Sequence, residues 1–215
     1  MDPPLIALLP ERERKEVLRL GRRRRFARNE VVFHEGDPGD TLHVLTKGHV
    51  AVRITTPLGD VGMLRVLGPG QVFGELAVVD IAPRSATIVA LDACETVALH
   101  RSHLDELRQA HPGIDRLLLA AMVDEVRRLS TQLLELMFVP VDKRLHRRLV
   151  DLARLFGTVA PVTVPLTQEA LAQLAGTTRP TTNRALRAAE AAGLVRVSRG
   201  RIEVLDIDGL ARRGR

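Results

Sequence analysis

The sequence predicts an α+β protein of 215 residues, with a roll of short strands, a long helix and a smaller C-terminal domain. Short β-branched runs alternate with glycines from residue 25 to residue 99, which is typical of an antiparallel roll or barrel. Leucines then recur at heptad spacing, and two short helical segments are followed by alternating strands. We expect domains at residues 1–110, 111–139 and 140–215.

Composition narrows the class of protein. The single cysteine, Cys94, excludes an internal disulfide framework and a cysteine-ligated iron–sulfur cluster. No apolar stretch reaches about 18 residues and no signal-peptide pattern opens the chain, so we expect a cytoplasmic protein. HExxH, P-loop and nucleophile-elbow motifs are absent and the histidines are scattered, so we expect neither catalysis nor a metal site.

The N-terminal elements follow from periodicity. Apolar residues at helical spacing predict an amphipathic helix over residues 5–20, in which Pro10 starts or breaks a turn. A short helix is expected at residues 74–79, and strands at residues 31–33, 42–45, 50–54, 63–66, 87–90 and 96–99. The arginine run at residues 22–25 is more often a solvated helix end or strand entry than a binding site.

Helical periodicity returns at Arg101, and a longer helix follows Pro112. Apolar residues in the longer helix step alternately by three and four, an a/d pattern that predicts a parallel homodimer with a seam of Leu119, Met122, Val126, Leu129, Leu133 and Leu136. The alternative is a helix packed only within its own subunit. Pro140 marks a hinge, after which Asp142 is expected to cap a helix that ends near Gly157.

Residues 167–194 predict a helix-turn-helix. Thr167 can cap the first helix, Gly176 supplies the turn, and the second helix runs from about Arg179 to Ala192. Alternating strands around residues 198–200 predict a hairpin wing. Residues 140–215 hold 14 Lys and Arg against 7 Asp and Glu, whereas the rest of the chain is nearly neutral. This segregation favours a polyanion-binding domain joined to a neutral sensor domain.

The segment FGELAVVDIAPRSAT, at residues 73–87, carries the clearest chemical signal. It sets Gly74 and Glu75 shortly before Arg84. A planar guanidinium suits the two exocyclic oxygens of a cyclic phosphate, and a carboxylate can accept from a ribose hydroxyl. A glycine lets backbone N–H groups approach the phosphate closely. The pattern predicts a site for a cyclic nucleotide, and its alternative is a buried Glu–Arg pair without a ligand.

This segment resembles the phosphate-binding cassette of the cyclic-nucleotide-binding superfamily, and the winged helix-turn-helix resembles that of the Crp/Fnr regulators. The resemblance implies that Arg84 clamps the phosphate, Glu75 accepts from the ribose, and Ser85 adds a hydroxyl donor. It also implies that Gly74 and Leu76 present their main-chain amides to the phosphate. Cyclic AMP is the effector that it favours, with no tightly bound cofactor.

The long helix departs from the pattern of the cyclic-AMP-responsive relatives. The hydroxyl pair that those relatives offer to the purine falls on Leu129 and Ser130, and their arginine falls on Glu125. Only Ser130 keeps a polar group of the type found in those relatives, a hydroxyl, so base recognition is expected to differ. Cyclic AMP, another nucleotide and nucleotide-independent action are all left open.

The resemblance also assigns residues to DNA. Arg179 and Arg184 align with base-reading arginines, and each can reach guanine O6 and N7. Further contacts are expected from Thr167, Gln168, Thr178, Thr181, Thr182 and Arg199. Pro180 stands where well-known members have glutamate, so the operator should differ at that base pair.

The implied partners are a two-fold symmetric double-stranded DNA operator, a second copy of the chain and RNA polymerase, with no membrane. A module that binds a cyclic nucleotide and acts on protein partners is the alternative function.

Overall fold

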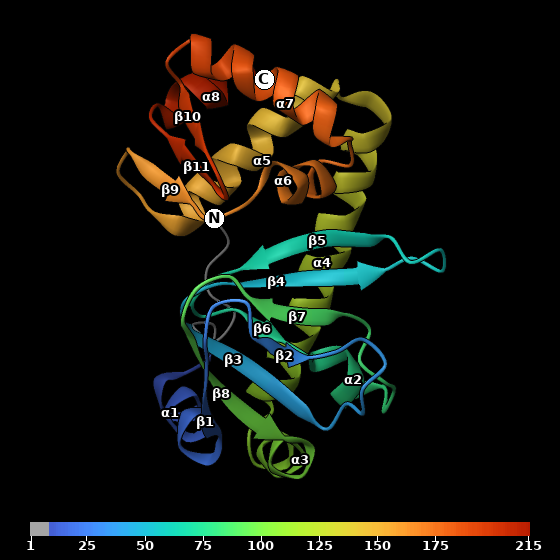
Figure 1. The fold of residues 1–215 in the computed structure, drawn as a ribbon. Coiled ribbons are helices and arrows are strands. Elements are labelled where there is room, and N and C mark those ends of the chain that lie inside the picture. Colours follow the sequence, from blue (N-terminus) through green and yellow to red (C-terminus); the bar gives the residue numbers. More distant parts are fainter. Residues whose placement is uncertain (1–8) are drawn as a thin grey trace. The chain divides into compact units, whose positions relative to one another are not determined.

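The computed structural model describes residues 9–215, which form two compact units (Figure 1). The N-terminal unit contains the described residues up to 61 together with residues 65–128, and the C-terminal unit contains residues 62–64 and 129–215. One strand, β5, and one helix, α4, therefore contribute to both units. None of the described helices is both long and apolar enough to cross a membrane.

Two four-stranded sheets with antiparallel pairing make up the roll. The first has strand order β1-β8-β3-β6 and the second β2-β7-β4-β5. The strands are β1 (Arg22–Phe26), β2 (Val31–Phe33), β3 (Thr41–Lys47), β4 (Val50–Thr55), β5 (Val61–Leu67), β6 (Val72–Phe73), β7 (Thr87–Ala90) and β8 (Cys94–His100). A short helix, α2 (Glu75–Val79), lies between β6 and β7.

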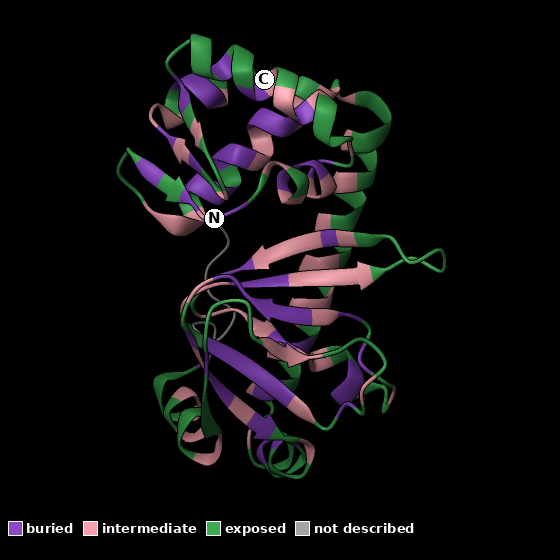
Figure 2. Ribbon diagram, viewed as in Figure 1, coloured by how far each residue is buried: buried purple, intermediate pink, exposed green. Residues whose placement is uncertain are grey.

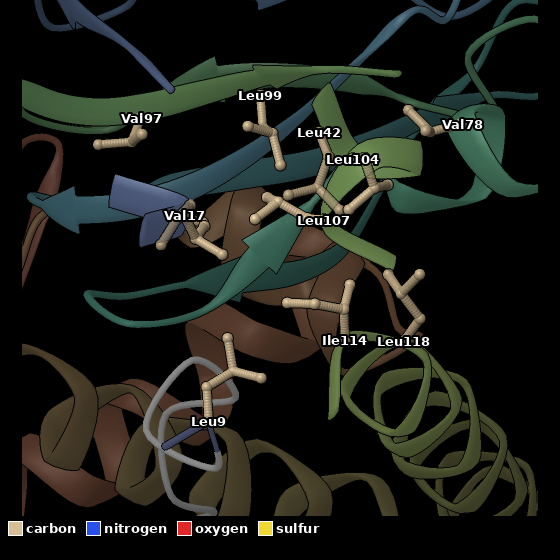
Figure 3. Close-up of a cluster of buried hydrophobic side chains, with 11 residues drawn as sticks. Leu9, Val17, Leu42, Val78, Val97, Leu99, Leu104, Leu107, Ile114 and Leu118 are labelled. Carbon is tan, nitrogen blue, oxygen red and sulfur yellow. The ribbon is translucent and has the colours of Figure 1, made fainter. Parts of the chain in front are cut away.

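Strand alternation divides the core into two clusters, because successive side chains point to opposite faces of a sheet. Leu42 of β3 joins a cluster completed by helices α1 (Glu11–Leu20), α3 (Arg101–Ala110) and α4 (Gly113–Phe138) (Figure 3). Leu45 lies three positions after Leu42 and so points to the other face of β3. It joins a second cluster with residues such as Phe26 and Phe73. Buried residues accordingly run along β3 and β8 in Figure 2.

Every strand expected in the roll is present, but β1 and β6 were not predicted. A run of four arginines has no apolar alternation, and β1 forms because it pairs with β8, from Arg22 opposite Ala98 to Phe26 opposite Cys94. Helix α1 begins after Pro10, which is its N-cap, so Pro10 does not lie within a longer helix. The expected apolar positions Leu5 and Leu8 lie outside the described residues.

The C-terminal unit packs helices on a three-stranded sheet of order β10-β11-β9. Its elements are α5 (Val141–Phe156), β9 (Val162–Val164), α6 (Gln168–Leu174), α7 (Arg179–Ala191), β10 (Val195–Ser198), β11 (Arg201–Val204) and α8 (Ile207–Arg213). The β10–β11 hairpin is the expected wing, with Ser198 opposite Arg201 and Gly200 at φ +74°.

Two expectations for this unit were wrong or incomplete. Pro140, not Asp142, is the N-cap of α5. Asp142 lies in the first turn, where its negative charge interacts favourably with the helix dipole. Helix α8 was not predicted, because it is only seven residues long and contains Gly209. It forms where Asp206 caps it by accepting from the Gly209 N–H, and where Leu210 is fully buried.

Removal of the Leu99 side chain tests the first core cluster. Leu99 is 1% exposed, so Leu99→Ala should lower the free energy of unfolding of the N-terminal unit by about 2–5 kcal/mol. The matched control is Leu58→Ala, because Leu58 is 92% exposed and its truncation should change stability by less than about 0.5 kcal/mol. Urea unfolding followed by circular dichroism measures both, and equal effects would contradict this packing.

Candidate ligand-binding and nucleic-acid-binding sites

Gly74 and Arg84 lie in contact, although they are ten residues apart in the chain. Gly74 follows β6 and is the N-cap of α2 at φ +79°, a backbone conformation that favours glycine. Arg84 Nη1 donates to the Gly74 carbonyl oxygen at 3.0 Å. A Cβ atom at position 74 would lie 2.7 Å from Arg84 Nη1, so only glycine leaves room for this contact.

Arg84 is 4% exposed and carries more donors than the described residues satisfy. Nη2 donates to Thr41 Oγ1 at 2.7 Å, and the guanidinium lies over the Phe33 ring at 4.1 Å. Nε has no hydrogen-bond partner among the described residues, and no described carboxylate forms an ion pair with the guanidinium. A buried charge with an unpaired donor is costly. The arrangement is therefore suited to accept an anion.

Glu75 is half-buried at the first position of α2. Burial raises its pKa, as does nearby Glu125, whereas its own backbone N–H, Arg65 and Arg84 lower it. Arg84 is therefore one of the charges that favour the ionised form of Glu75, and their joint role at a ligand stays a prediction. Leu76 and Ser85 are exposed beside this pair. Ser130 is exposed on α4 in the C-terminal unit, and its role stays a prediction.

Three residues around Arg84 were not identified from the sequence: Phe33, Thr41 and His43. His43 is buried, its Nδ1 lies 3.1 Å from Thr96 Oγ1, and its ring stacks on Phe73 with centroids 5.1 Å apart. These residues come from β2 and β3, far from the cassette in the chain, so no local spacing marked them. Arg84 also lines a cleft of about 590 Å³ together with these three residues, and Glu75 lies outside its lining.

The helix-turn-helix has the caps that the sequence predicted. Thr167 Oγ1 accepts from the Ala170 N–H at 3.1 Å and so caps α6. Gly176 makes the turn at φ +60°, and Gly193 ends α7 at φ +70°. Leu186 and Ala189 are buried, as expected for the inward face of α7.

The predicted DNA contacts divide by exposure. Arg179, Arg184 and the wing residue Arg199 are exposed, as are Thr167 and Thr178. Thr181 is half-buried, with its hydroxyl 3.1 Å from that of Thr178. Gln168 Oε1 accepts from Asn183 Nδ2 at 2.9 Å, a pairing that the sequence did not indicate.

The assignment of Thr182 to DNA is wrong, because Thr182 is 0% exposed. It lies four and seven positions before Leu186 and Ala189, on the same inward face of α7. Its hydroxyl has no hydrogen-bond partner among the described residues. The helical spacing could have revealed this, but the residue type suggested a polar face.

Comparison with known proteins finds a matching family for each of the two units. Residues 23–111 match the cyclic nucleotide-binding domain family, and residues 143–213 match the Crp-like helix-turn-helix domain family. A CRP-like cAMP-activated global transcriptional regulator of Mycobacterium tuberculosis is 34% identical, over 88% of this chain and 87% of its own. The chain belongs to the Crp/Fnr family of transcription regulators.

Other relatives and solved structures extend this likeness. The cyclic AMP receptor protein of Thermus thermophilus is 32% identical, over 94% of this chain and 92% of its own. The crystal structure of the Thermus thermophilus catabolite activator protein has a TM-score of 0.58 at 31% identity, covering 99% of this chain and 98% of that one. The c-di-GMP responsive regulator CLP of Xanthomonas campestris has the same fold, with a TM-score of 0.74 at 24% identity, covering 91% and 99%.

Buried His43 makes stability depend on pH. Burial, with Arg84 and Arg24, lowers its pKa from 6.5 to about 4, against an opposing effect of Asp40. Between these two values the unfolded chain binds the proton that the folded chain excludes, so acidification destabilises the fold, by up to about 3 kcal/mol for this group. The free energy of unfolding should therefore fall less between about pH 7 and pH 4.5 in His43→Gln than in the wild type. An identical fall in both proteins would contradict a neutral, buried His43.

Proposed function

We propose that this Crp/Fnr regulator is controlled by a cyclic nucleotide, which binds at Arg84 and switches the DNA affinity of a homodimer. The observation that carries the proposal is the buried Arg84 guanidinium, which lies beside Gly74 and Glu75 without an ion-pair partner among the described residues. A cyclic phosphate supplies the single negative charge and the two acceptor oxygens that this guanidinium lacks. Glu75 then accepts from the ribose hydroxyl.

Cyclic AMP is the first effector to test, because the relatives at 34% and 32% identity are named for it. Leu76 and Ser85 lie next to Glu75 and Arg84 in the chain and are exposed, which supports their roles as an amide and a hydroxyl donor at the phosphate. Ser130 is proposed as a purine contact from α4. No further tightly bound cofactor is proposed.

The dimer is supported by the apolar residues that α4 leaves exposed. Leu119, Val126 and Leu133 are 65%, 62% and 59% exposed, and Leu129 and Leu136 are 45% and 50% exposed. They recur at heptad spacing, and Met122 of the same pattern is half-buried. Leucines at such positions on a soluble helix gain from burial against a second helix. We therefore propose α4 as the seam between two copies.

Control of DNA binding follows as a population shift between two arrangements of the dimer. A shift from 1:99 to 99:1 needs about 5.5 kcal/mol of differential ligand binding. Several charge-assisted hydrogen bonds made only in the DNA-competent form can supply it. The bound form places two recognition helices in successive major grooves of a two-fold symmetric operator, and RNA polymerase is the proposed downstream partner.

Nucleotide-independent DNA binding is a second candidate. It is favoured by the contacts of Arg84, because two of its nitrogens already donate to Gly74 and Thr41 within the chain. A gel shift on one operator fragment with and without cyclic AMP separates the two candidates. DNA affinity that is high and unchanged by the nucleotide favours the second.

Loss of the guanidinium tests the ligand site. Arg84→Ala should weaken cyclic AMP binding at least a hundredfold, because the phosphate loses its charge-assisted partner. Titration calorimetry measures the affinity, and thermal melting checks that the variant is folded. The matched control is Arg23→Ala, which removes an exposed arginine of the same unit. An unchanged affinity in Arg84→Ala would refute the clamp.

Arg179 tests the DNA interface. Arg179→Ala should lower affinity for the operator by about 1–3 kcal/mol and lower affinity for random DNA much less, because a bidentate guanine contact reads sequence. Arg212→Ala is a matched control, since it removes an exposed arginine from α8. Gel shifts on both DNAs supply the measurement, and an equal loss on both would reassign Arg179 to phosphate contact.

A further inference from the structure

Strand β1 consists mostly of arginines, and the functions above do not use them. Because successive side chains of a strand point to opposite faces, Arg22 and Arg24 share one face with Phe26. On the other face, Arg25 Nε lies 3.3 Å from Glu95 Oε1. Neither Arg22 nor Arg24 forms an ion pair with a carboxylate among the described residues. Both exposed guanidinium groups therefore keep donors for another partner.

This face of β1 borders the cleft of about 590 Å³ that Arg84 also lines. The volume is within the range of about 300–1,000 Å³ that small-molecule sites occupy. The lining comes from β1, β2 and the segment after it, β3, β8 and α3, all within the N-terminal unit. Gly74 and Glu75 are outside the lining, so the cleft differs from the cassette although the two share Arg84.

The walls of the cleft combine an apolar surface with one buried cation. Phe26, Val32, Phe33 and His43 all line it. Arg84 is 4% exposed and lies over the Phe33 ring at 4.1 Å. Its Nε has no hydrogen-bond partner among the described residues. A ligand with an acceptor for this guanidinium and an apolar body for these walls satisfies both.

Positive charge predominates in the cleft. The described lining contains three arginines and two carboxylates, Asp37 and Asp40. Burial lowers the pKa of His43 from 6.5 to about 4, and the charges of Arg84 and Arg24 act in the same direction. Asp40 acts in the opposite direction but less strongly. The charge of the arginines thus reaches the buried wall at His43, where it favours a bound anion.

We propose that this cleft is a second ligand site, which binds a small organic anion: a carboxylate or phosphate group on an apolar or aromatic body. The arginines of the lining supply the donors, since a guanidinium can pair with two oxygens of either group through parallel hydrogen bonds. The body of the ligand packs on Phe26 and Phe33.

Fluorescence titration of the full chain tests the proposal with 1-naphthoate and 1-naphthyl phosphate, which carry the two anionic groups on one aromatic body. The chain contains no Trp and no Tyr, so the naphthyl emission is measured with little protein background. At least one of the two anions should bind saturably, and the tighter one identifies the preferred group. Neutral 1-naphthamide should bind at least about tenfold more weakly, because it lacks the charge-assisted hydrogen bonds.

Variants on the two faces of β1 locate the site. Arg24→Ala should weaken binding of the preferred anion about tenfold or more, because one charged donor is lost. The matched control is Arg23→Ala, on the opposite face of the strand, which should leave the affinity unchanged. Cyclic AMP is titrated into the same proteins. Arg24→Ala should leave its affinity unchanged, whereas Arg84→Ala should weaken both ligands.

Nuclear magnetic resonance gives a second readout. The His43 ring signals, assigned by their loss in His43→Gln, should shift when the anion binds, because His43 lines the cleft. No saturable binding of either anion at millimolar concentration, equal affinity in Arg24→Ala and Arg23→Ala, or binding without this shift would each overturn the proposal while leaving the nucleotide site at Arg84 intact. If the anions bind as expected but cyclic AMP does not bind, the cleft stands and the proposed function fails.

Discussion

The burial of one guanidinium organises the N-terminal unit. Arg84 is almost fully removed from solvent, and its described partners are a carbonyl oxygen, a hydroxyl and an aromatic ring. These neutral groups satisfy part of its hydrogen-bonding capacity, and the nearby carboxylates Asp40, Asp37 and Glu75 act on it through their charges without forming an ion pair with it. A buried charge without a close counterion is costly. The roll must therefore be stable enough to hold a cation ready for an anion. Its two apolar clusters, on opposite faces of β3, provide that stability.

The same reasoning connects the ligand site with the long helix. Burial and the negative charge of Glu125 raise the pKa of Glu75, and Glu125 is itself held by arginines from β5 and from its own helix. The charge of Glu125 on α4 thus acts on Glu75 of the cassette, within the N-terminal unit. Helix α4 also carries the exposed heptad leucines. We propose that this electrostatic link carries the effect of a ligand at Arg84 to the surface of α4 that is proposed to meet a second copy of the chain.

The C-terminal unit separates its stabilising residues from the residues that we propose read DNA. In α7 the inward positions Thr182, Leu186 and Ala189 are buried, while Arg179 and Arg184 are exposed. Glycines at positive φ end α7 and turn the wing, and side-chain caps begin α6 and α8. Arginines can be displayed in this way because the apolar face and the caps, not the polar face, determine the fold.

The sequence by itself determined most elements in their order, though not β1, β6 or α8. It also determined the cassette and the helix-turn-helix, because periodicity, glycine turns and caps are local signals. It also predicted that Gly74, Glu75 and Arg84 act together, since the three lie within one short segment. The tertiary structure alone decided that Phe33, Thr41 and His43 surround Arg84 and that residues 22–25 form a strand. It alone placed Arg65 against Glu125. The physical reason is that these outcomes depend on pairing and packing between segments far apart in the chain, and such contacts leave no periodic mark in the sequence.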